Sequence, residues 1–555
     1  MVLVETATMG SEAAGKRTMT GGQALAASLR QEGVETVFGL PGVQLDGAFD
    51  ALYEARDAIR VLHTRHEQAA AYMADGYARA TGREGTCLVV PGPGLLNASA
   101  ALSTAYACNS SVLCVTGQIQ SDLIEFGRGL LHEIPHQLEM IRSVVKHAAR
   151  ATTPAEIPGV VREAFVQMRS GRPRPVEIEI PPDVLVATAA VELLPPAPPR
   201  ARSAGDPDLL ERAAKLLGAA KQPVIYAGGG IHRAQAWDEL LALAEVLQAP
   251  VITSNNGKGA ISDRHYLAHG PVSGMELLPR ADVILAVATR FVDPATSRWR
   301  ITHDPTVIQL DVDPAEIGRN YPVAVRLVAD AKAGLAALTE RAARHAGRRP
   351  SRETELSALK RAAAAKINRV QPQAGFGLAI RSALPDEGIV VTEMTQIAYW
   401  ANAGFPVYGP NTYLTPGYQG TLGFGFTTAL GAKVGRPEVP VVSINGDGGF
   451  GFTLNELATM AQHEIAAVAV VFNDGAYGNV KRIQQQQFGG HTIASELRNP
   501  DYVKLAAAFG VAGRRVETPA ALESALREAF RANEPTLIEV PVGPMPSPWQ
   551  ALGLR

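Results

Sequence analysis

The sequence predicts an α/β protein built from three doubly wound domains with parallel sheets. Short apolar runs rich in β-branched residues alternate with helical stretches rich in Ala, Leu and Glu along nearly the whole chain. This alternation is typical of parallel sheets covered by helices on both faces. The length, 555 residues, is several times the roughly 100–200 residues of one domain. Two shifts of composition divide the chain into three blocks.

The two shifts of composition predict exposed linkers. One is LLPPAPPRARSAGDP (193–207) and the other is RAARHAGRRPSRETELS (341–357), and both are rich in residues that favour linkers and turns. We read residues 1–17 as a frayed tail. The domains are expected at residues 18–190, 206–342 and 370–545.

Every block contains expected strands that run into Gly, Asn or Asp. Because ligands of such sheets bind beyond the carboxyl ends of the strands, these loops are the candidate sites. The runs are TVFGLPG (36–42), GTCLVVPGPG (85–94) and SVLCVTGQ (111–118) in the first block; QPVIYAGGG (222–230), APVITSN (249–255), DVILAVATR (282–290) and TVIQLDVD (306–313) in the second; GIVVTE (388–393), VPVVSINGDG (439–448) and AAVAVVFNDG (466–475) in the third.

Composition excludes several function classes. The net charge is −2 and the pI is near 6.7, so there is no basic field for nucleic acid or an anionic membrane, and the expected partners are small molecules and other subunits. No apolar run approaches the ~20 residues of a membrane span. Cys87, Cys108 and Cys114 lack metal-ligand spacing and are expected in the core of a reduced, cytoplasmic protein.

The stretch NGDGGF (445–450) places one carboxylate, Asp447, where a buried strand should end. A helical stretch and a second strand follow, and that strand runs into Asn473. A right-handed crossover puts two such strands side by side, so Asp447 and Asn473 can converge. Oxygen ligands of this kind suit Mg²⁺ or Ca²⁺, and Mg²⁺ takes further ligands from phosphate and water. On these residues alone, a helix cap and a turn are an equally good interpretation.

The GDG motif, followed by Asn473 at this interval, resembles the diphosphate-binding motif of thiamine-diphosphate enzymes. Motifs in all three blocks resemble the acetolactate synthase branch of that family, in the same order. They are TRHEQAAAYMADGYARATG (64–82), FGLPG, GPGLLNA and TGQ in the first block, VIQLDVDPAEIGRN in the second and GYQGTLGFGFTTALGA in the third. The resemblance implies a pyrimidine-binding, a central and a diphosphate-binding domain.

The resemblance also implies a reaction. An enzyme of this branch uses thiamine diphosphate and Mg²⁺ to decarboxylate a 2-oxoacid and joins the product to a second carbonyl compound. A simple 2-oxoacid decarboxylase and a hydroxyketone lyase of the benzaldehyde lyase type are the enzymatic alternatives. A protein that binds the cofactor without turning it over is a further alternative, but Glu67 argues against it because diphosphate binding does not require that residue. The sequence does not fix the donor or the acceptor.

The resemblance implies roles for residues of the first and third blocks. Glu67 matches the glutamate that hydrogen-bonds the aminopyrimidine ring and shifts it to its imino tautomer, and it opens a predicted helix whose dipole favours an anion. Asp447, Asn473 and the Gly475 carbonyl match the metal ligands. Leu422 matches the apolar residue under the bend between the two rings. The implied cofactor-binding set is Gln396, Gly420, Leu422, Gly446, Asp447, Gly448, Gly449, Asn473 and Gly475.

Two further residues are candidates for catalysis. Gln118, at the end of a buried strand, is a candidate for the donor pocket. His132 lies in GLLHEIPHQ, together with Glu133 and His136, where the branch has a loop that closes on the active site. One of these three residues could transfer protons during turnover.

FAD is possible as a further cofactor, because the central domain of the branch often holds it and Arg290 matches an arginine near it. The glycine-rich VIYAGGGIHR (224–233) lacks the full GxGxxG order of a dinucleotide site. A tight turn between strand and helix is therefore the favoured interpretation of that stretch.

The sequence departs from the acetolactate synthase pattern at two places. Thr395-Gln396-Ile397-Ala398 lacks the histidine of G-Q-H-Q, which helps to hold the diphosphate, and Ile483 stands where the branch usually has tryptophan. Gln484–Gln487 favours a solvated helix face over a lid. In the family, the first domain of one subunit faces the third domain of another, so a homodimer or homotetramer with shared sites is expected.

Overall fold

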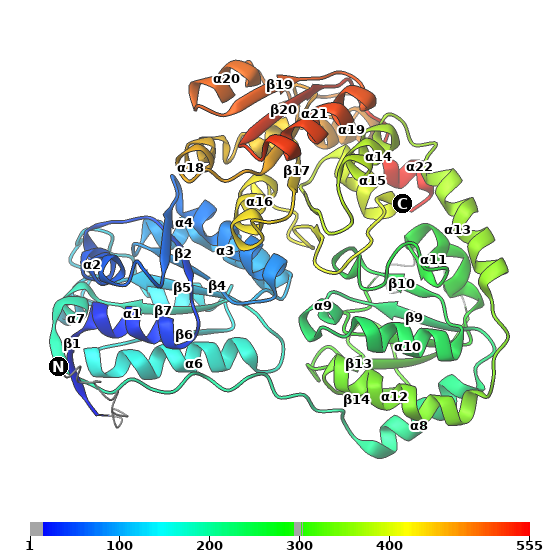
Figure 1. The fold of residues 1–555 in the computed structure, drawn as a ribbon, viewed down its shortest axis with the longest axis horizontal. Coiled ribbons are helices and arrows are strands. Elements are labelled where there is room, and N and C mark those ends of the chain that lie inside the picture. The colour runs from blue at the N-terminus through cyan, green and yellow to red at the C-terminus, as the bar shows by residue number, and fades with distance from the viewer. Residues whose placement is uncertain (1–14, 293–300, 302, 555) are drawn as a thin grey trace, which may run out of the picture.

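A computed structural model describes residues 15–292, 301 and 303–554 and places three α/β domains at the corners of a triangle (Figure 1). Each domain contains a six-stranded parallel sheet with helices on both faces. The predicted fold class is therefore confirmed. Residues 1–14 of the predicted tail lie outside the described part, but Arg17 does not fray: it begins β1 (Arg17–Thr20), which pairs antiparallel with β8 (Thr188–Val191).

The first sheet has β-branched and apolar residues along strands that are buried on both faces. Its spatial order is β3 (Arg60–His63), β2 (Thr36–Gly39), β4 (Gly85–Val89), β5 (Val112–Gly117), β7 (Val176–Ile180) and β6 (His147–Arg150). One face is covered by α1 (Gly21–Gln31), α2 (Asp46–Glu54) and α6 (Ile157–Arg169), and the other by α3 (Glu67–Thr81) and α4 (Pro93–Ala107).

The third sheet repeats this topology. Its order is β16 (Tyr413–Leu414), β15 (Ile389–Thr392), β17 (Val441–Gly446), β18 (Val468–Asn473), β20 (Thr536–Pro541) and β19 (Ala512–Arg515). One face carries α16 (Phe424–Gly435), α18 (Leu457–Gln462) and α20 (Tyr502–Ala508), and the other α14 (Gln373–Ala383), α15 (Gln396–Gly404), α21 (Pro519–Ala532) and α22 (Pro548–Leu552). If each sheet's strands are numbered along the chain, both sheets read 2-1-3-4-6-5.

The central sheet has a different order, which reads 3-2-1-4-5-6 in the same notation. Its strands are β11 (Ala268–His269), β10 (Val251–Thr253), β9 (Pro223–Ala227), β12 (Val283–Val287), β13 (Thr306–Asp311) and β14 (Val325–Val328). Its helices include α8 (Pro207–Ala219), α9 (Gly230–Ala234), α10 (Trp237–Leu247), α11 (Pro271–Leu277) and α12 (Ala331–Ala346).

Helices α3 and α16 cross at very short distance and join the first and third domains. A Cβ on Gly76 would lie 2.0 Å from the Thr428 carbonyl oxygen, and one on Gly431 would lie 1.9 Å from that of Met73. Glycine is needed at both positions because any side chain would collide with backbone. The two domains consequently share one continuous hydrophobic core, which fixes their relative position.

One expectation about local structure was wrong. The second linker, expected over 341–357, is mostly helical, because α12 continues to Ala346 and α13 (Glu353–Ile367) starts soon after; the fully buried Leu356 anchors α13 in the central core.

The helical stretch expected after Asp447 is present between β17 and β18. It consists of a single turn, α17 (Asp447–Phe450), then a 3₁₀ turn and the six-residue α18.

No helix within the described ranges has both the length and the apolar character needed to cross a membrane. The three cysteines are free and buried, as expected for core residues.

Candidate functional site

The main candidate site lies where the strand order of the third sheet changes direction, between β15 and β17. Crossovers leave these neighbouring strands toward opposite sides, so the loops after them open a crevice at the carboxyl edge of the sheet. The loop after β15 leads to Gln396, which is buried at the start of α15. The loop after β17 is Gly446-Asp447-Gly448-Gly449, with Asp447 buried as the first residue of α17.

Asp447 and Asn473 converge, as predicted. Strands β17 and β18 pair in parallel, and the side-chain amide nitrogen of Asn499 lies 2.6 Å from Asp447 Oδ2 and 2.8 Å from Asn473 Oδ1. Both oxygens therefore point at one position, which the NH₂ group of Asn499 takes. The amide group donates hydrogen bonds to both oxygens, and a cation at the same position would attract them more strongly.

A second carboxylate lies beside this point. Burial, and next the charge of Asp447, raise the pKa of Asp474 to about 6, and burial also raises the pKa of Asp447. Two carboxyl groups held together away from water favour a bound positive charge. Gly475 has φ of +65°. Its amide donates to Asn473 Oδ1 at 3.3 Å, and its carbonyl accepts from the Leu497 amide at 2.7 Å.

Glu393 is a buried acid that links the two loops of this crevice. Its Oε1 accepts from the Gly423 amide at 2.5 Å, and its Oε2 lies 2.1 Å from where a Cβ on Gly449 would be. Among the described residues, Oε2 has no hydrogen-bond partner. Burial raises the pKa of Glu393 to about 8, although backbone amides around Gly423 oppose this. The carboxyl group is therefore neutral at physiological pH.

The loop of Gly420 and Leu422 approaches the same crevice from the start of α16. Thr421, between them, contacts the Tyr72 hydroxyl at 2.8 Å and the Thr104 hydroxyl at 2.9 Å, so two helices of the first domain hold this loop. Gly420 has φ of +58°, a conformation that favours glycine. Leu422 is half-buried, which leaves part of its side chain available to a ligand.

Glu67 begins α3, as predicted, with His66 as the N-cap. Its side chain is 8 % exposed. Asn97, on α4, donates to Glu67 Oε2 at 3.0 Å. The other oxygen, Oε1, makes no hydrogen bond to a described residue and lies beside Gly94, where a Cβ would come within 3.5 Å of it. The carboxylate thus has one oxygen fixed by the protein and one free to act on a ligand.

Gln118 belongs to a buried network rather than to an open pocket. Its amide nitrogen lies 3.3 Å from Glu179 Oε2 and its oxygen accepts from the Ile119 amide at 2.8 Å. Gln137 joins the same network by bonding Glu179, the Gly117 carbonyl and the Gly92 amide. The network ties the end of β5 to the loop at Gly92, which leads into α4 and to Asn97 beside Glu67. Gln118 therefore helps to position that loop. Its role in the donor pocket stays a prediction.

His132 lies on the segment between β5 and α5 (Gln137–Ile141) and is half-buried, with φ of +67°. Its Nδ1 lies 3.0 Å from Gln44 Oε1, and the Gln44 amide nitrogen donates to the Leu131 carbonyl at 3.0 Å. Glu133 instead bonds the Leu130 amide, and His136 is exposed at the start of α5. Of the three, His132 is the one that the fold orients.

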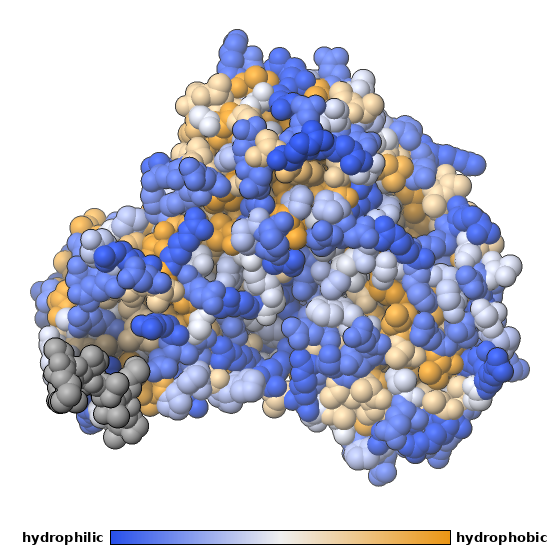
Figure 2. Space-filling view, in the orientation of Figure 1, coloured by the Kyte–Doolittle hydropathy of each residue, from blue (hydrophilic) through white to orange (hydrophobic). Residues whose placement is uncertain are grey.

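The Glu67 cluster and the Asp447 cluster are not joined to each other. Among the described residues, no hydrogen bond or ion pair connects the members of one cluster with those of the other. Each has an exposed apolar neighbour, Leu96 at 45 % and Phe452 at 52 % exposure. On the face drawn in Figure 2, hydrophobic surface gathers along the border between the first and third domains.

A second candidate site is a cavity of about 510 Å³ at the change of strand order in the central sheet, between β9 and β12. An open sheet with the order 3-2-1-4-5-6 places dinucleotides at this point. Among the described residues, four arginines line the cavity, against one carboxylate, Asp311. The arginines are Arg172, Arg200, Arg233 and Arg290.

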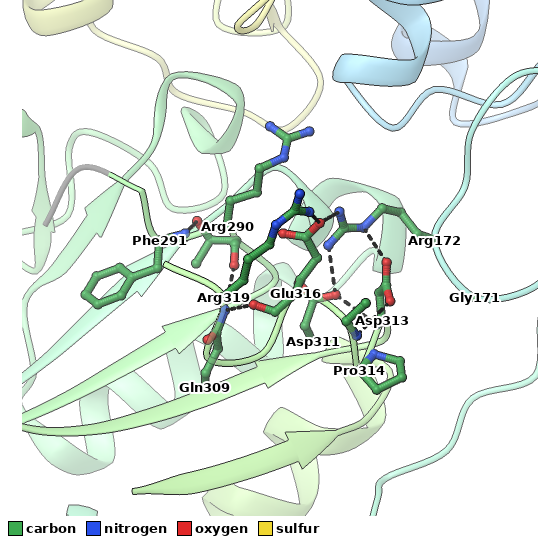
Figure 3. A network of polar contacts seen from close by, with 12 residues as sticks. Gly171, Arg172, Arg290, Phe291, Gln309, Asp311, Asp313, Pro314, Glu316 and Arg319 are labelled. Carbon is green, nitrogen blue, oxygen red and sulfur yellow. Dashed lines mark hydrogen bonds and ion pairs between the residues drawn. The ribbon is translucent and has the colours of Figure 1, made fainter. Parts of the chain in front are cut away.

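Two of these arginines pair with carboxylates. Arg200 Nε lies 3.8 Å from Asp330 Oδ2. Arg172 contacts Asp311, Asp313 and Glu316, and Figure 3 shows Arg290 pointing away from these last three carboxylates. Arg233 is half-buried and donates to the Ala78 carbonyl at 3.4 Å; burial, with Arg79 nearby, lowers the pKa of Arg233 to about 10. The cavity therefore holds an excess of positive charge and suits an anionic ligand.

The turn of Gly228, Gly229 and Gly230 borders this cavity. A Cβ on Gly228 would lie 2.1 Å from the Ala288 carbonyl oxygen, so the strands β9 and β12 approach closely only because the residue is glycine. The favoured interpretation of a tight turn between strand and helix is confirmed, because β9 ends at Ala227 and α9 starts at Gly230. The same turn brings backbone to the cavity wall.

Sequence reasoning missed four residues of the main site: Gln44, Asn97, Glu393 and Asn499. Asn97 and Glu393 lie at the ends of motifs that had been singled out, GPGLLNA and GIVVTE, so their position was a usable signal. Gln44 and Asn499 act across more than 20 residues of chain. No local pattern marks such contacts.

Each of the three domains matches a domain of a known protein family. The thiamine pyrophosphate enzyme N-terminal TPP binding domain matches residues 19–140, the central domain matches 210–338 and the C-terminal TPP binding domain matches 393–540. The probable acetolactate synthase large subunit of Methanocaldococcus jannaschii is 36% identical, over 95% of this chain and 92% of its own length. The probable 2-ketoarginine decarboxylase of Pseudomonas aeruginosa is 37% identical over 95% and 94%. The acetolactate synthase isozyme 3 large subunit of Escherichia coli is 32% identical over 94% and 95%.

Proposed function

We propose a reaction for this chain from the premise that it belongs to the thiamine pyrophosphate enzyme family, to which all three of its domains match. The chain is a thiamine-diphosphate-dependent enzyme similar to acetolactate synthases. It decarboxylates a 2-oxoacid and joins the remaining acyl group to a second carbonyl compound. We propose pyruvate as donor.

The convergence of Asp447 and Asn473 on one point carries this proposal. Bound thiamine diphosphate supplies a carbanion that adds to the 2-oxoacid carbonyl and accepts the electrons left when CO₂ departs. In this chain Asp447, Asn473 and the Gly475 carbonyl would hold Mg²⁺ for the diphosphate, with the Asn499 amide giving way to the ion. Gly446, Gly448 and Gly449 leave the backbone open to the phosphates, and Gln396 starts the facing helix.

Glu67 would exchange a proton with the aminopyrimidine ring. Its fixed oxygen faces Asn97, so the free oxygen is the one that reaches the ring nitrogen. Leu422, half-buried beside the crevice, would support the bend between the rings. His132, oriented by Gln44, would hold or release the proton that the product needs.

Ile483 would set the acceptor. It is half-buried on α19 (Gly478–Gln487), and a sec-butyl group in place of an indole leaves a wider site. A hydrophobic pocket discriminates by only about 1–3 kcal/mol per methylene, so aldehydes should compete with a second pyruvate. Of the neighbouring glutamines, Gln485–Gln487 are exposed, whereas Gln484 bonds the Ile493 backbone.

Product analysis with pyruvate plus an aldehyde tests the proposal. We expect CO₂ release with hydroxyketones beside acetolactate, and Ile483→Trp should shift the ratio toward the small acceptor without stopping CO₂ release. No CO₂ from pyruvate or from any other 2-oxoacid would contradict the proposed reaction. CO₂ and free aldehyde without any ligated product would favour the simple decarboxylase, the second candidate, which the name of the Pseudomonas relative supports.

FAD would occupy the central cavity. The excess of arginine suits a diphosphate, and the strand order and the Gly228–Gly230 turn suit a dinucleotide. Arg233 and Arg290, which pair with no carboxylate of a described residue, would contact the phosphates. Titration of the protein with FAD, followed by flavin fluorescence, should show saturable binding that weakens at least tenfold in Arg233→Gln. Equal fluorescence with and without protein would contradict it.

The assembly would be a homodimer or a homotetramer with sites between subunits. The support is that, within the described part of one chain, no hydrogen bond or ion pair joins the Glu67 cluster to the Asp447 cluster, and that exposed Leu96 and Phe452 flank them. A second copy would bring the Glu67 cluster of one chain to the Asp447 cluster of the other and cover the apolar surface.

A further inference from the structure

A separate cavity of about 190 Å³ lies between the central and third domains, beside α13. Its lining residues differ from those of the central cavity, although Lys258 and Val272 closely follow residues of that cavity in sequence, and we call it the interdomain cavity. One part of its wall is polar and the other apolar. The polar wall is Lys258, Asp263, His269, Ser273, Lys360 and Asn368, and the apolar wall includes Val272, Ile367, Ala403 and Phe405.

His269, in the wall of this cavity, is a buried polar side chain without a partner. It is 3 % exposed, and neither ring nitrogen makes a hydrogen bond to a described residue. The Tyr266 carbonyl is near the ring without completing a hydrogen bond, and burial lowers the pKa of His269 to about 4. A neutral imidazole with unused polar atoms in a cavity calls for a ligand, because unpaired buried polar groups are costly.

Lys258 presents a positive charge to the same cavity. It is 7 % exposed and its ammonium makes no hydrogen bond to a described residue; it lies 5.6 Å from the centre of the Tyr413 ring. Lys360 is a second ammonium, bonded to the backbone carbonyls of Asp263 and His265. The one carboxylate, Asp263, accepts from the Val407 amide at 2.8 Å. Two ammonium groups against one carboxylate leave one uncompensated positive charge.

The interdomain cavity is connected to the cofactor crevice by one rigid element. Ala403, Gly404 and Phe405 line the cavity at the carboxyl end of α15, and Gln396 starts the same nine-residue helix at the crevice. A ligand that packs against one end of α15 therefore acts on the position of the other. This is the physical requirement for coupling between two sites.

We propose that the interdomain cavity binds a small aliphatic monocarboxylate, with its carboxylate toward Lys258 and His269 and its alkyl group against Ala403 and Phe405. One negative charge matches the single excess positive charge, and the apolar wall matches a short branched chain. Occupation holds the carboxyl end of α15 and tightens the binding of thiamine diphosphate. The site does not depend on the reaction that the enzyme catalyses.

Calorimetric titration with isobutyrate tests the proposal, because this carboxylate cannot be decarboxylated as a 2-oxoacid. We expect saturable binding that is at least tenfold weaker in Lys258→Met and in His269→Leu. Lys215→Met removes the same charge from an exposed position on α8 and should bind as the wild type does. Isobutyramide, which has the same shape without the charge, should not bind. Saturating isobutyrate should lower the dissociation constant of thiamine diphosphate at least threefold.

Several outcomes would overturn the proposal. These are no binding of isobutyrate, binding that is equal in Lys258→Met, His269→Leu and wild type, or binding of inorganic phosphate in place of the carboxylate. The His269→Leu variant keeps the test valid if Lys258→Met does not fold. A comparison with pyruvate, made in the Glu67→Gln protein, separates two sources of the carboxylate. If pyruvate binds more tightly than isobutyrate and this binding needs Lys258, the ligand of the cavity is the 2-oxoacid. If isobutyrate binds more tightly, the ligand is a simple carboxylate. All of these readouts are independent of product formation.

Discussion

Asn97 donates a hydrogen bond to Glu67 across 3.0 Å, from α4 to the first residue of α3. The bond fixes one oxygen of a nearly buried carboxylate and leaves the other free. Since Glu67 matches the residue that acts on the aminopyrimidine ring, the orientation of this carboxylate is the feature through which the first domain contributes to catalysis.

Removing the Asn97 amide should slow turnover. Asn97→Ala deletes a hydrogen bond to a charged group, which is worth about 1.5–3 kcal/mol, so kcat should fall at least about tenfold while the affinity for thiamine diphosphate changes little. Ser99→Ala, on the same helix, removes only a bond to the Leu96 carbonyl and is the control. Steady-state kinetics decide it: equal kcat in both variants would mean that Asn97 does not orient Glu67.

Asp447 and Asn499 should respond differently to substitution. Asp447→Ala removes a ligand and leaves the diphosphate charge uncompensated, so Mg²⁺-dependent affinity for thiamine diphosphate should fall at least about 100-fold. Asn499→Ala should change that affinity no more than about threefold, because the Asn499 amide is displaced when Mg²⁺ binds. Calorimetry with and without Mg²⁺ measures both, and a loss of the same size in Asn499→Ala would argue that Asn499 is itself part of the bound site.

Glu393 should make stability fall as the pH rises. Its pKa is raised from 4.5 to about 8 in the folded protein, so between these values the folded state holds a proton that the unfolded state has lost. The contribution of Glu393 to the free energy of unfolding is complete below about pH 4.5. It is lost as the pH rises through 8, by up to about 1.4 kcal/mol per pH unit. Glu393→Gln cannot titrate.

The measurement is the thermal midpoint of the wild type and of Glu393→Gln at several values between pH 5 and 8. The wild-type midpoint should fall with pH relative to that of the variant. Midpoints that stay parallel over this range would show that Glu393 does not carry the proton.

Shared sites should allow two inactive chains to complement each other. A mixed dimer of Glu67→Gln and Asp447→Ala chains contains one site with both native residues, if each site takes Glu67 from one subunit and Asp447 from the other. We expect verified mixed dimers to recover part of the activity, up to about half per dimer. Mixed dimers as inactive as the two parents would place both residues of a site in the same chain.

Much of the fold was predictable from the sequence because parallel strands buried on both faces leave continuous apolar runs such as VVSIN and VAVVF. Strands at the sheet edges were not, since β19 is AGRR and only partly buried. In the site, Asp447, Asn473 and Glu67 follow such runs or open a helix and could be found locally. Contacts made in space could not. Asn499 joins Asp447 across 52 positions, and although Gly76 and Gly431 lie within the quoted motifs, nothing in those motifs shows that the two glycines let α3 and α16 cross closely.

The most direct test of the central claim, that Glu67 moves a proton on bound thiamine diphosphate, is deuterium exchange at C2 of the cofactor in wild type and Glu67→Gln. Calorimetry first establishes that both proteins bind the cofactor and Mg²⁺ to saturation. The account predicts fast exchange in the wild type and exchange slowed by at least about 100-fold in Glu67→Gln, because an amide cannot share the proton. Exchange at the wild-type rate in Glu67→Gln would contradict it.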